Sequence, residues 1–352
     1  MHDQRSIPDF QLRAVRLWLL CAAAMIFLTL VIGGATRLTE SGLSIVEWQP
    51  VSGVLPPMSE NAWQDEFEKY QAIPQYRELN RGMSLGQFKT IYWWEWTHRL
   101  VARTVGAVFL LPFLFFLARG WVPRRLRIRL WTIFGAGALL GVVGWWMVSS
   151  GLSGTRVSVS QYRLAFHLSL ACAIYAAIVW TAQQLAPMTR SAAHKRLRFV
   201  ALTIVGLLLV QIYLGALVAG LHAGLIYNSW PMIDGAFVPE AARLWFMTPA
   251  WRNLFENTLT VQFDHRIMAY AIWVLAGLHA IDARQARNGA AGAVVLAGTV
   301  TLQAALGVAT LMNRAPLPLS LAHQWMAIIV FTIALVHAER LCHRGEFRSL
   351  AP

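Results

Sequence analysis

Long apolar segments alternate with polar connections along the whole chain of 352 residues. An apolar run of about 20 residues is long enough to cross a bilayer as a helix. Eight runs approach that length, and their approximate bounds are 14–34, 99–118, 128–149, 162–185, 197–221, 264–283, 290–312 and 318–341. The pattern therefore predicts an all-α integral membrane protein with eight transmembrane helices.

Two stretches of similar sequence follow the first and the fifth of these segments. One begins at Gly42 and reads GLSIVEWQPVSGVLP, and the other begins at Gly224 and reads GLIYNSWPMIDGAFVP. A tryptophan and a second glycine recur at matching distances from the first glycine: Trp48 and Gly53, Trp230 and Gly235. The similarity predicts an internal repeat with halves 1–190 and 191–352. Because each half holds four segments, we expect two four-helix bundles related by a pseudo-two-fold axis along the membrane normal.

Composition and charge agree with a membrane protein. The chain is 57% hydrophobic and only 13% charged, which excludes a soluble enzyme of this length. The net charge is +13, and the excess of Lys and Arg falls in the N-terminus, the connections after even-numbered segments and the C-terminus. This asymmetry predicts an inner-membrane protein with both termini in the cytoplasm. The basic charge then reflects topology and contact with anionic lipid, and it predicts no nucleic-acid partner.

Four histidines lie just inside the same end of four apolar segments: His98 and His167 in the first half, His265 and His323 in the second. Ionisable side chains inside a bilayer are costly and mark functional sites. Paired imidazoles on facing helices are one way in which a membrane bundle binds haem iron. A single membrane histidine is more often a structural hydrogen-bonding contact, but four at matched depth favour two haem sites. Zinc is disfavoured because no thiolate or HExxH-type cluster accompanies them.

The two halves differ beside one histidine. Glu95 lies three residues before His98, about one helical turn away, whereas the matching residue of the second half is Gln262. An amide cannot transfer a proton, so the carboxylate predicts that chemistry occurs at the first site while the second stores or relays electrons. The alternative is an interfacial carboxylate that pairs with Arg99 or Arg103.

Other polar side chains have two interpretations each. Three arginines lie about one turn from the histidines and could neutralise haem propionates or reach toward the headgroups: Arg99, Arg103 and Arg266. His279 and His337 each fall 14 residues beyond a proposed ligand, about four helical turns, so a third haem is an alternative. The matching residues of the first half, Pro112 and Thr181, argue against it. His222 is interpreted as an interface residue.

The three cysteines lie in or at the end of apolar segments: Cys21, Cys172 and Cys342. The chain has no CxxC or CxxCH motif, which disfavours a disulfide framework and covalently attached haem. We interpret the cysteines as small buried apolar residues.

Several motifs resemble those of haem A synthases. The run GATRLTESGLS from Gly34 is similar to the family signature after the first helix. Further matches follow in chain order over nearly the whole sequence: Trp48 to Pro57, RGMSL from Arg81, Phe88-Lys89, EWTHR from Glu95, QFDHR from Gln262, and His323-Gln324. Some bacterial members carry a cysteine pair in the first outer loop. This chain has none, so it resembles the mitochondrial and alphaproteobacterial kind.

The resemblance implies oxidation of the C8 methyl group of haem O to a formyl group, which gives haem A for terminal oxidases. It implies that His98 and His167 hold the iron of the substrate haem, and that His265 and His323 hold a permanent haem b. Both sites would lie toward the outer side of the membrane. The implied partners are haem O, an unidentified electron donor, haem O synthase, oxidase assembly proteins and a second copy of the chain.

Two other functions fit the histidine pattern alone. One is a two-haem electron-transfer cytochrome without a substrate. The other is a haem carrier or oxidase assembly factor without catalytic activity. Extracted pigments distinguish the first from the synthase, because a cytochrome of this kind would hold haem B alone. Conversion of added haem O distinguishes the second.

Overall fold

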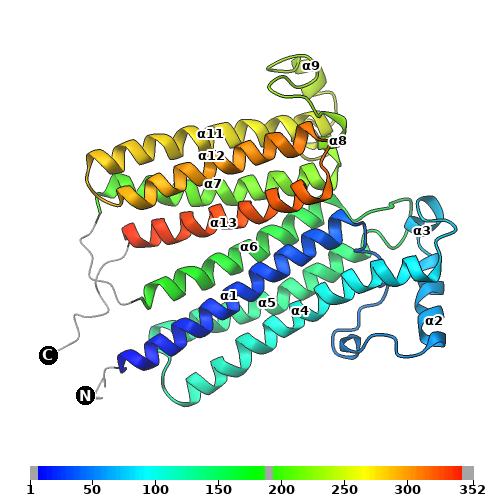
Figure 1. Ribbon diagram of the computed structural model, residues 1–352, viewed down its shortest axis with the longest axis horizontal. Coiled ribbons are helices and arrows are strands. Elements are labelled where there is room, and N and C mark those ends of the chain that lie inside the picture. The colour runs from blue at the N-terminus through cyan, green and yellow to red at the C-terminus, as the bar shows by residue number, and fades with distance from the viewer. Residues whose placement is uncertain (1–6, 187–192, 343–352) are drawn as a thin grey trace.

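The computed structural model describes residues 7–186 and 193–342, and this part of the chain is almost entirely helical (Figure 1). It has no strand, only one isolated bridge between Ile233 and Ala236. Eight of its helices are long and apolar enough to span a membrane, which confirms the prediction of a multi-pass membrane protein. They are α1 (Asp9–Leu38), α4 (Leu85–Ala118), α5 (Arg124–Ser149), α6 (Gln161–Gln184), α7 (Lys195–Gly220), α11 (Thr258–Gln285), α12 (Ala290–Met312) and α13 (Leu317–Cys342).

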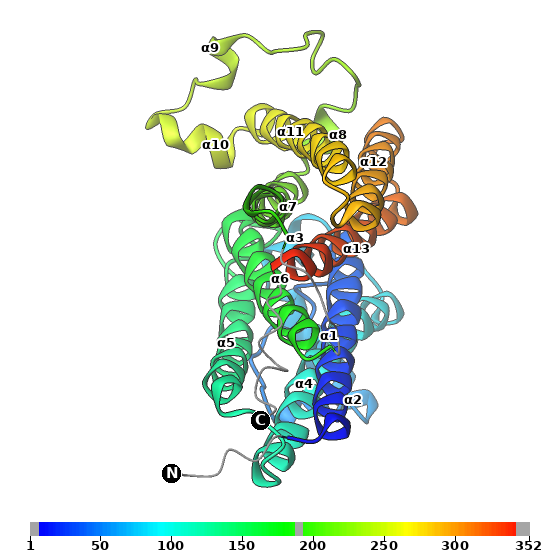
Figure 2. The ribbon, with the colours of Figure 1, turned by 90° about the vertical axis from the view of Figure 1, so that its left-hand side faces the viewer.

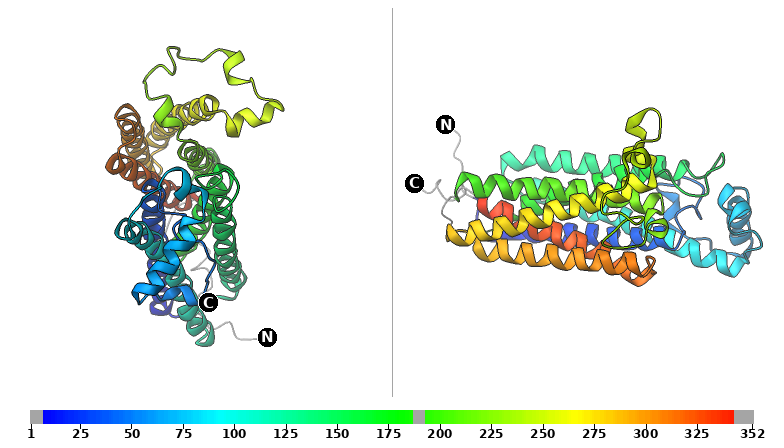
Figure 3. Two further views of the ribbon diagram at one scale, coloured as in Figure 1. Left: turned by 90° about the vertical axis from the view of Figure 1, so that its right-hand side faces the viewer. Right: turned by 90° about the horizontal axis from the view of Figure 1, so that it is seen from above.

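The connections after α1 and α7 are the long ones, and both lie at one end of the bundle, here called the loop end (Figures 1 and 3). They contain short helices: η1 (Ser52–Val54), α2 (Glu60–Gln71) and α3 (Pro74–Glu78) in the first, and α8 (Ala223–Ile226), α9 (Ala241–Leu244), η2 (Ala250–Arg252) and α10 (Asn253–Glu256) in the second. Figure 2 shows that the segment around α9 loops out from the long helices, whereas α10 returns to pack on α11.

Helix α4 begins 14 residues before the apolar segment that predicts it. Ser84 caps its first turn through the backbone N–H of Gln87, and the Gln87 side chain accepts from the Ser84 N–H, a reciprocal capping box. Its added turns bury Phe88 and Tyr92 against aromatic residues of α2. The helix therefore extends beyond the membrane-length segment and supports the first outer connection.

The long helices pack in two similar sets of four. Helix α1 contacts α4 and α6, and α5 contacts α4 and α6; in the same way α7 contacts α11 and α13, and α12 contacts α11 and α13. The two sets meet where α6 packs on α7 and where α13 packs on α1 and α6. Tyr175 and Thr332 share a hydrogen bond of 2.7 Å across this seam. The apolar core is continuous through both sets.

Polar contacts fasten the seam near the loop end. The Arg37 guanidinium donates to the Ala219 carbonyl at 3.1 Å and lies 3.1 Å from His222 Nε2. Both His222 and Glu40, its match in the first half, have left-handed backbone, with φ of 52° and 54°. The Gln324 amide donates to the Leu30 carbonyl at 2.8 Å. His222 therefore lies at the interface, as the sequence predicted.

Candidate haem-binding site

Each of the four histidines lies on a helix that begins at the loop end, and each ring packs against a glycine of a neighbouring helix. A Cβ atom built on Gly33 of α1 would lie 2.7 Å from His98 Cε1, closer than real Cβ contacts allow. Gly307 with His323 is equally close at 2.7 Å, and Gly144 with His167 and Gly215 with His265 are slightly less close, at 3.0 and 3.1 Å. A side chain at Gly33 or Gly307 would displace the histidine ring, and one at Gly144 or Gly215 would press on it.

The rings also form two pairs in space. The rings of His98 and His167 lie close enough for a charge on one to affect the other, and the same holds for His265 and His323. The Nδ1 atoms of His98, His167 and His323 are buried and make no hydrogen bond. Buried polar nitrogens without a partner are unusual, and neutral imidazole is a good ligand for haem iron. The residues present therefore fit a haem in each half. The described residues contain no group of three or more His, Cys, Asp or Glu that could hold a metal ion unaided.

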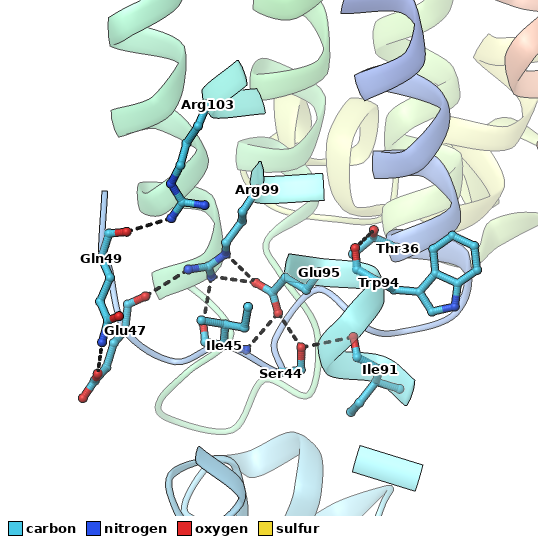
Figure 4. A network of polar contacts seen from close by, with 10 residues as sticks. All are labelled: Thr36, Ser44, Ile45, Glu47, Gln49, Ile91, Trp94, Glu95, Arg99 and Arg103. Carbon is cyan, nitrogen blue, oxygen red and sulfur yellow. Dashed lines mark hydrogen bonds and ion pairs between the residues drawn. The ribbon is translucent and has the colours of Figure 1, made fainter. Parts of the chain in front are cut away.

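Glu95 is only 2% exposed and belongs to a polar network with Ser44, Ile45 and Arg99 (Figure 4). Its carboxylate accepts from Ser44 Oγ at 2.8 Å, from the Ile45 N–H at 2.9 Å and from Arg99 Nη2 at 2.6 Å. Arg99 donates further to the Ile45 and Glu47 carbonyls. This is the ion pair with Arg99 that the alternative interpretation expected, except that it is buried and fastens the segment after α1 to α4.

The other two candidate arginines also bind the outer connections. Arg103 donates to the Gln49 carbonyl at 2.7 Å and the Pro50 carbonyl at 3.0 Å, and it does not contact Glu95. Arg266 donates to the Tyr227 and Met232 carbonyls, both at 3.3 Å. Arg103 Nη1 and Arg266 Nε are buried without a partner. Each arginine therefore keeps a donor for an anionic group.

Gln262 occupies the place of Glu95 in the second half. It is 3% exposed, and its amide donates to the Tyr227 carbonyl at 3.3 Å. A carbonyl of the second outer connection thus takes the place of the Ser44 and Ile45 donors. At the same helical position, Glu95 accepts hydrogen bonds from the outer connection, whereas Gln262 donates one to it.

His279 and His337 contact each other directly. Their Nε2 atoms are 2.9 Å apart, and both side chains are buried, against Gly289 and Gly292 in the case of His337. An iron atom between two imidazoles would hold these nitrogens about 4 Å apart, at about 2 Å for each metal–nitrogen bond. The geometry is that of a hydrogen-bonded pair, so it does not support the alternative of a third haem.

The cysteines are free, but one differs from its interpretation. Cys172 is buried and Cys342 partly buried, whereas Cys21 is exposed on the surface of α1. A thiol facing lipid meets an apolar environment without being inside the protein core. The prediction that all three are buried was therefore wrong for Cys21.

Two residues beside the histidines were missed by the sequence analysis. Gln211 on α7 donates to the His265 carbonyl at 3.0 Å, and Gln303 on α12 donates to the His323 carbonyl at 3.0 Å. Each lies one turn before a glycine that packs on the same histidine, in the matching runs QIYLG and QAALG. That repeated spacing is the signal in the sequence that could have found them.

Comparison with known proteins shows which family the chain belongs to. Residues 16–335 match the model of the COX15-CtaA family, described as cytochrome oxidase assembly protein. The chain belongs to this family. Members named heme A synthase include one from Rhodopseudomonas palustris strain TIE-1, 60% identical over 334 residues, which are 94% of this chain and 90% of the relative. Another, from Bradyrhizobium diazoefficiens, is 59% identical over 341 residues, 96% of this chain and 94% of the relative.

Proposed function

We propose that this protein is a haem A synthase, which oxidises the C8 methyl group of haem O to a formyl group and so supplies haem A for terminal oxidases. Membership of the cytochrome oxidase assembly family and near full-length similarity to proteins named heme A synthase support this function. The observation that carries it is the two histidine pairs, each ring seated on a helical glycine, in two similarly packed sets of helices.

The proposal divides the work between the halves. His98 and His167 hold the iron of the substrate, haem O, in the first half. His265 and His323 hold haem b in the second half, where its iron stores and relays electrons when bound. The conversion of methyl to formyl removes four electrons: two hydroxylations, whose oxidant and oxygen atoms come from outside the chain, give a gem-diol, which loses water to leave the aldehyde. Arg99, Arg103 and Arg266 remain the proposed partners of haem propionates, and the unpartnered nitrogens of Arg103 and Arg266 support these two most directly.

Glu95 remains the proposed proton-handling group at the first site. It lies one turn from His98, and Gln262 at the matching place cannot transfer a proton. Its four hydrogen bonds, from Ser44, Ile45 and twice from Arg99, give it a second role, because they fix the segment after α1 against α4. The two roles predict different results for its amide variant, a slower reaction if the carboxylate transfers protons and a less stable fold if it only holds the segment.

We further propose that the protein lies in the inner membrane with both termini in the cytoplasm and the loop end on the outer side. The excess of Lys and Arg in the connections at the opposite end supports this orientation. The proposed partners are an electron donor, haem O synthase, oxidase assembly proteins and a second copy of the chain. The repeat of four helices is proposed to relate halves 1–190 and 191–352.

Pigment analysis of the purified protein tests the function. We expect haem B together with haem O or haem A, and we expect added haem O to be converted to haem A under reducing conditions. Haem B alone without conversion would instead indicate an electron-transfer cytochrome.

His265→Ala or His323→Ala should remove the haem b signal, whereas His98→Ala or His167→Ala should leave it and abolish conversion. Equal loss of haem b in all four variants would contradict the division between halves.

A further inference from the structure

We propose that Gln211 and Gln303 are positioning residues that keep haem b permanently bound in the second half, and that their absence from the first half allows haem there to exchange. The inference rests on the proposed function and adds to it a reason why one site retains its haem while the other releases a product. It concerns residues that bind neither iron nor porphyrin in the proposed scheme.

Both glutamines hold the main chain of a proposed ligand. Gln211 Nε2 donates to the His265 carbonyl at 3.0 Å and lies 3.1 Å from His265 Nδ1. Gln303 Nε2 donates to the His323 carbonyl at 3.0 Å. Each bond joins two helices, α7 to α11 and α12 to α13, at the residue that carries the imidazole. The amide thus fixes the backbone of the ligand while the glycine one turn away fixes its ring.

The glutamines are not explained by stability alone. The Oε1 atoms of Gln211 and Gln303 are buried and make no hydrogen bond. A buried acceptor without a partner is unfavourable, and an apolar residue of similar size would avoid that penalty. What the two glutamines share is the use of the N–H group, which each directs to the carbonyl of a candidate haem ligand one turn before the glycine that packs on it.

Among the described residues of the first half, no side chain donates a hydrogen bond to the carbonyl of His98 or His167. Thr29 is the match of Gln211, and its hydroxyl donates to the Met25 carbonyl of its own helix at 2.8 Å. Leu140 lies one turn before Gly144, as Gln303 does before Gly307, and it has no polar side-chain atom. His98 and His167 are therefore seated on glycines without a bond that holds their main chain. A ligand that can shift is suited to a haem that must enter as substrate and leave as product.

The test compares haem b retention in full-length protein purified in detergent. Gln211→Met and Gln303→Met, singly and together, remove the polar atoms at similar side-chain size. We expect transfer of haem b to excess apomyoglobin to become about ten- to a hundredfold faster in the double variant. We also expect the low-spin electron paramagnetic resonance signal to shift or broaden, because the imidazole planes are freed. Gln324→Met is the matched control, since its amide binds the Leu30 carbonyl and no ligand.

The outcomes separate this inference from the proposed function. Wild-type protein that contains no haem b would contradict the proposed function of the second half. Haem b in the wild type, with the same release rate and spectrum in the double variant, would overturn the role of the glutamines. If the double variant does not fold, Leu140→Gln tests the inference from the other half. It should slow haem release from the first site without changing haem b, and an unchanged rate would contradict the proposal.

Discussion

At the scale of the residue, a glycine on the neighbouring helix determines how each candidate histidine lies. Gly307→Ala would place a Cβ 2.7 Å from His323 Cε1, so we expect the ring to be displaced and haem b to be lost or weakly bound. Gly298→Ala on the same helix is the control, because its Cβ would meet nothing within 4 Å. Both substitutions favour the helix by about 1 kcal/mol, because alanine is the better helix former. A loss of haem b in Gly307→Ala alone would therefore result from the contact with the His323 ring. The haem-to-protein ratio of the two variants measures it, and equal ratios would contradict the close packing.

Glu95→Gln tests the proposed proton-handling group. If the carboxylate transfers protons, the variant should keep haem b and form haem A about 10²–10⁴-fold more slowly. If it only fixes the outer segment in place, the main effect should be a loss of stability, because the change leaves the partly buried Arg99 without its anionic partner. Gln262 indicates that the fold accepts an amide at this helical position.

Arg99→Gln is the matched control for that comparison. It breaks the same ion pair from the other side without removing a proton carrier. The rate of haem A formation, normalised to bound haem b, and the thermal midpoint should both be measured for the two variants. Similar losses of rate in both would mean that Glu95 acts through the network and that another group handles protons.

The sequence predicted the candidate histidines because their spacing repeats, and it singled out Glu95 because its match is an amide. It could not assign the burial of the ion pair or the partners of Glu95, since Ser44 and Ile45 are about 50 residues away along the chain. Gln211 and Gln303 were missed because they bind a main-chain carbonyl on another helix. That contact depends on the relative rotation of two helices, which a pattern of side chains does not determine.

At the scale of the element, a charged contact ties the second outer connection to the other half. Glu256 of α10 accepts from Tyr162 of α6 at 2.8 Å and from Arg252 at 2.5 Å. The hydrogen bond from Arg252, followed by that from Tyr162, holds the pKa of Glu256 below its usual range. A lowered folded-state pKa means that the contact stabilises the fold above the unfolded value, about 4.3, and that this contribution is lost as the pH falls through the folded value.

We therefore expect the second outer connection to loosen on acidification below about pH 4. Limited proteolysis between pH 3 and pH 7, with an acid-active protease, should show faster cleavage of this connection at the low end in the wild type. Glu256→Gln should remove most of that dependence, because an amide does not titrate in this range. The same pH profile in the variant and the wild type would assign the effect to other carboxylates.

Element boundaries followed the apolar pattern except where helices leave the membrane-length segment. All eight predicted segments lie within long helices or extend past them by only one residue at an end. The apolar run begins 14 residues after the start of α4 because Lys89 and Glu95 interrupt it. The helix itself begins at Leu85, where Ser84 and Gln87 form the cap. The short helices of the outer connections have no periodic apolar pattern of membrane length, so the sequence did not predict them.

At the scale of the whole molecule, the sequence predicted eight membrane helices and two sets of four. It did not predict the seam, where Arg37 meets Ala219 and Tyr175 meets Thr332. These residues have no special spacing, and their contacts follow from how α1, α6, α7 and α13 pack against one another. The order of neighbours in each set could be inferred from a repeat, but the angle between the sets could not.

The placement of all four histidines near the loop end has an electrical consequence. An electron that passes between the proposed sites moves parallel to the bilayer plane and crosses little of the transmembrane field. Moving one charge fully across 100 mV changes its free energy by about 2.3 kcal/mol. An electron that moves parallel to the membrane plane avoids nearly all of this change in free energy. We expect the distribution of electrons between the two haems, measured by redox titration in sealed vesicles, to stay the same when a potential is imposed. A shift of tens of millivolts would require the sites to lie at different depths. With the proposed sites at one depth, electron transfer between them would be non-electrogenic and would proceed equally in energised and de-energised membranes.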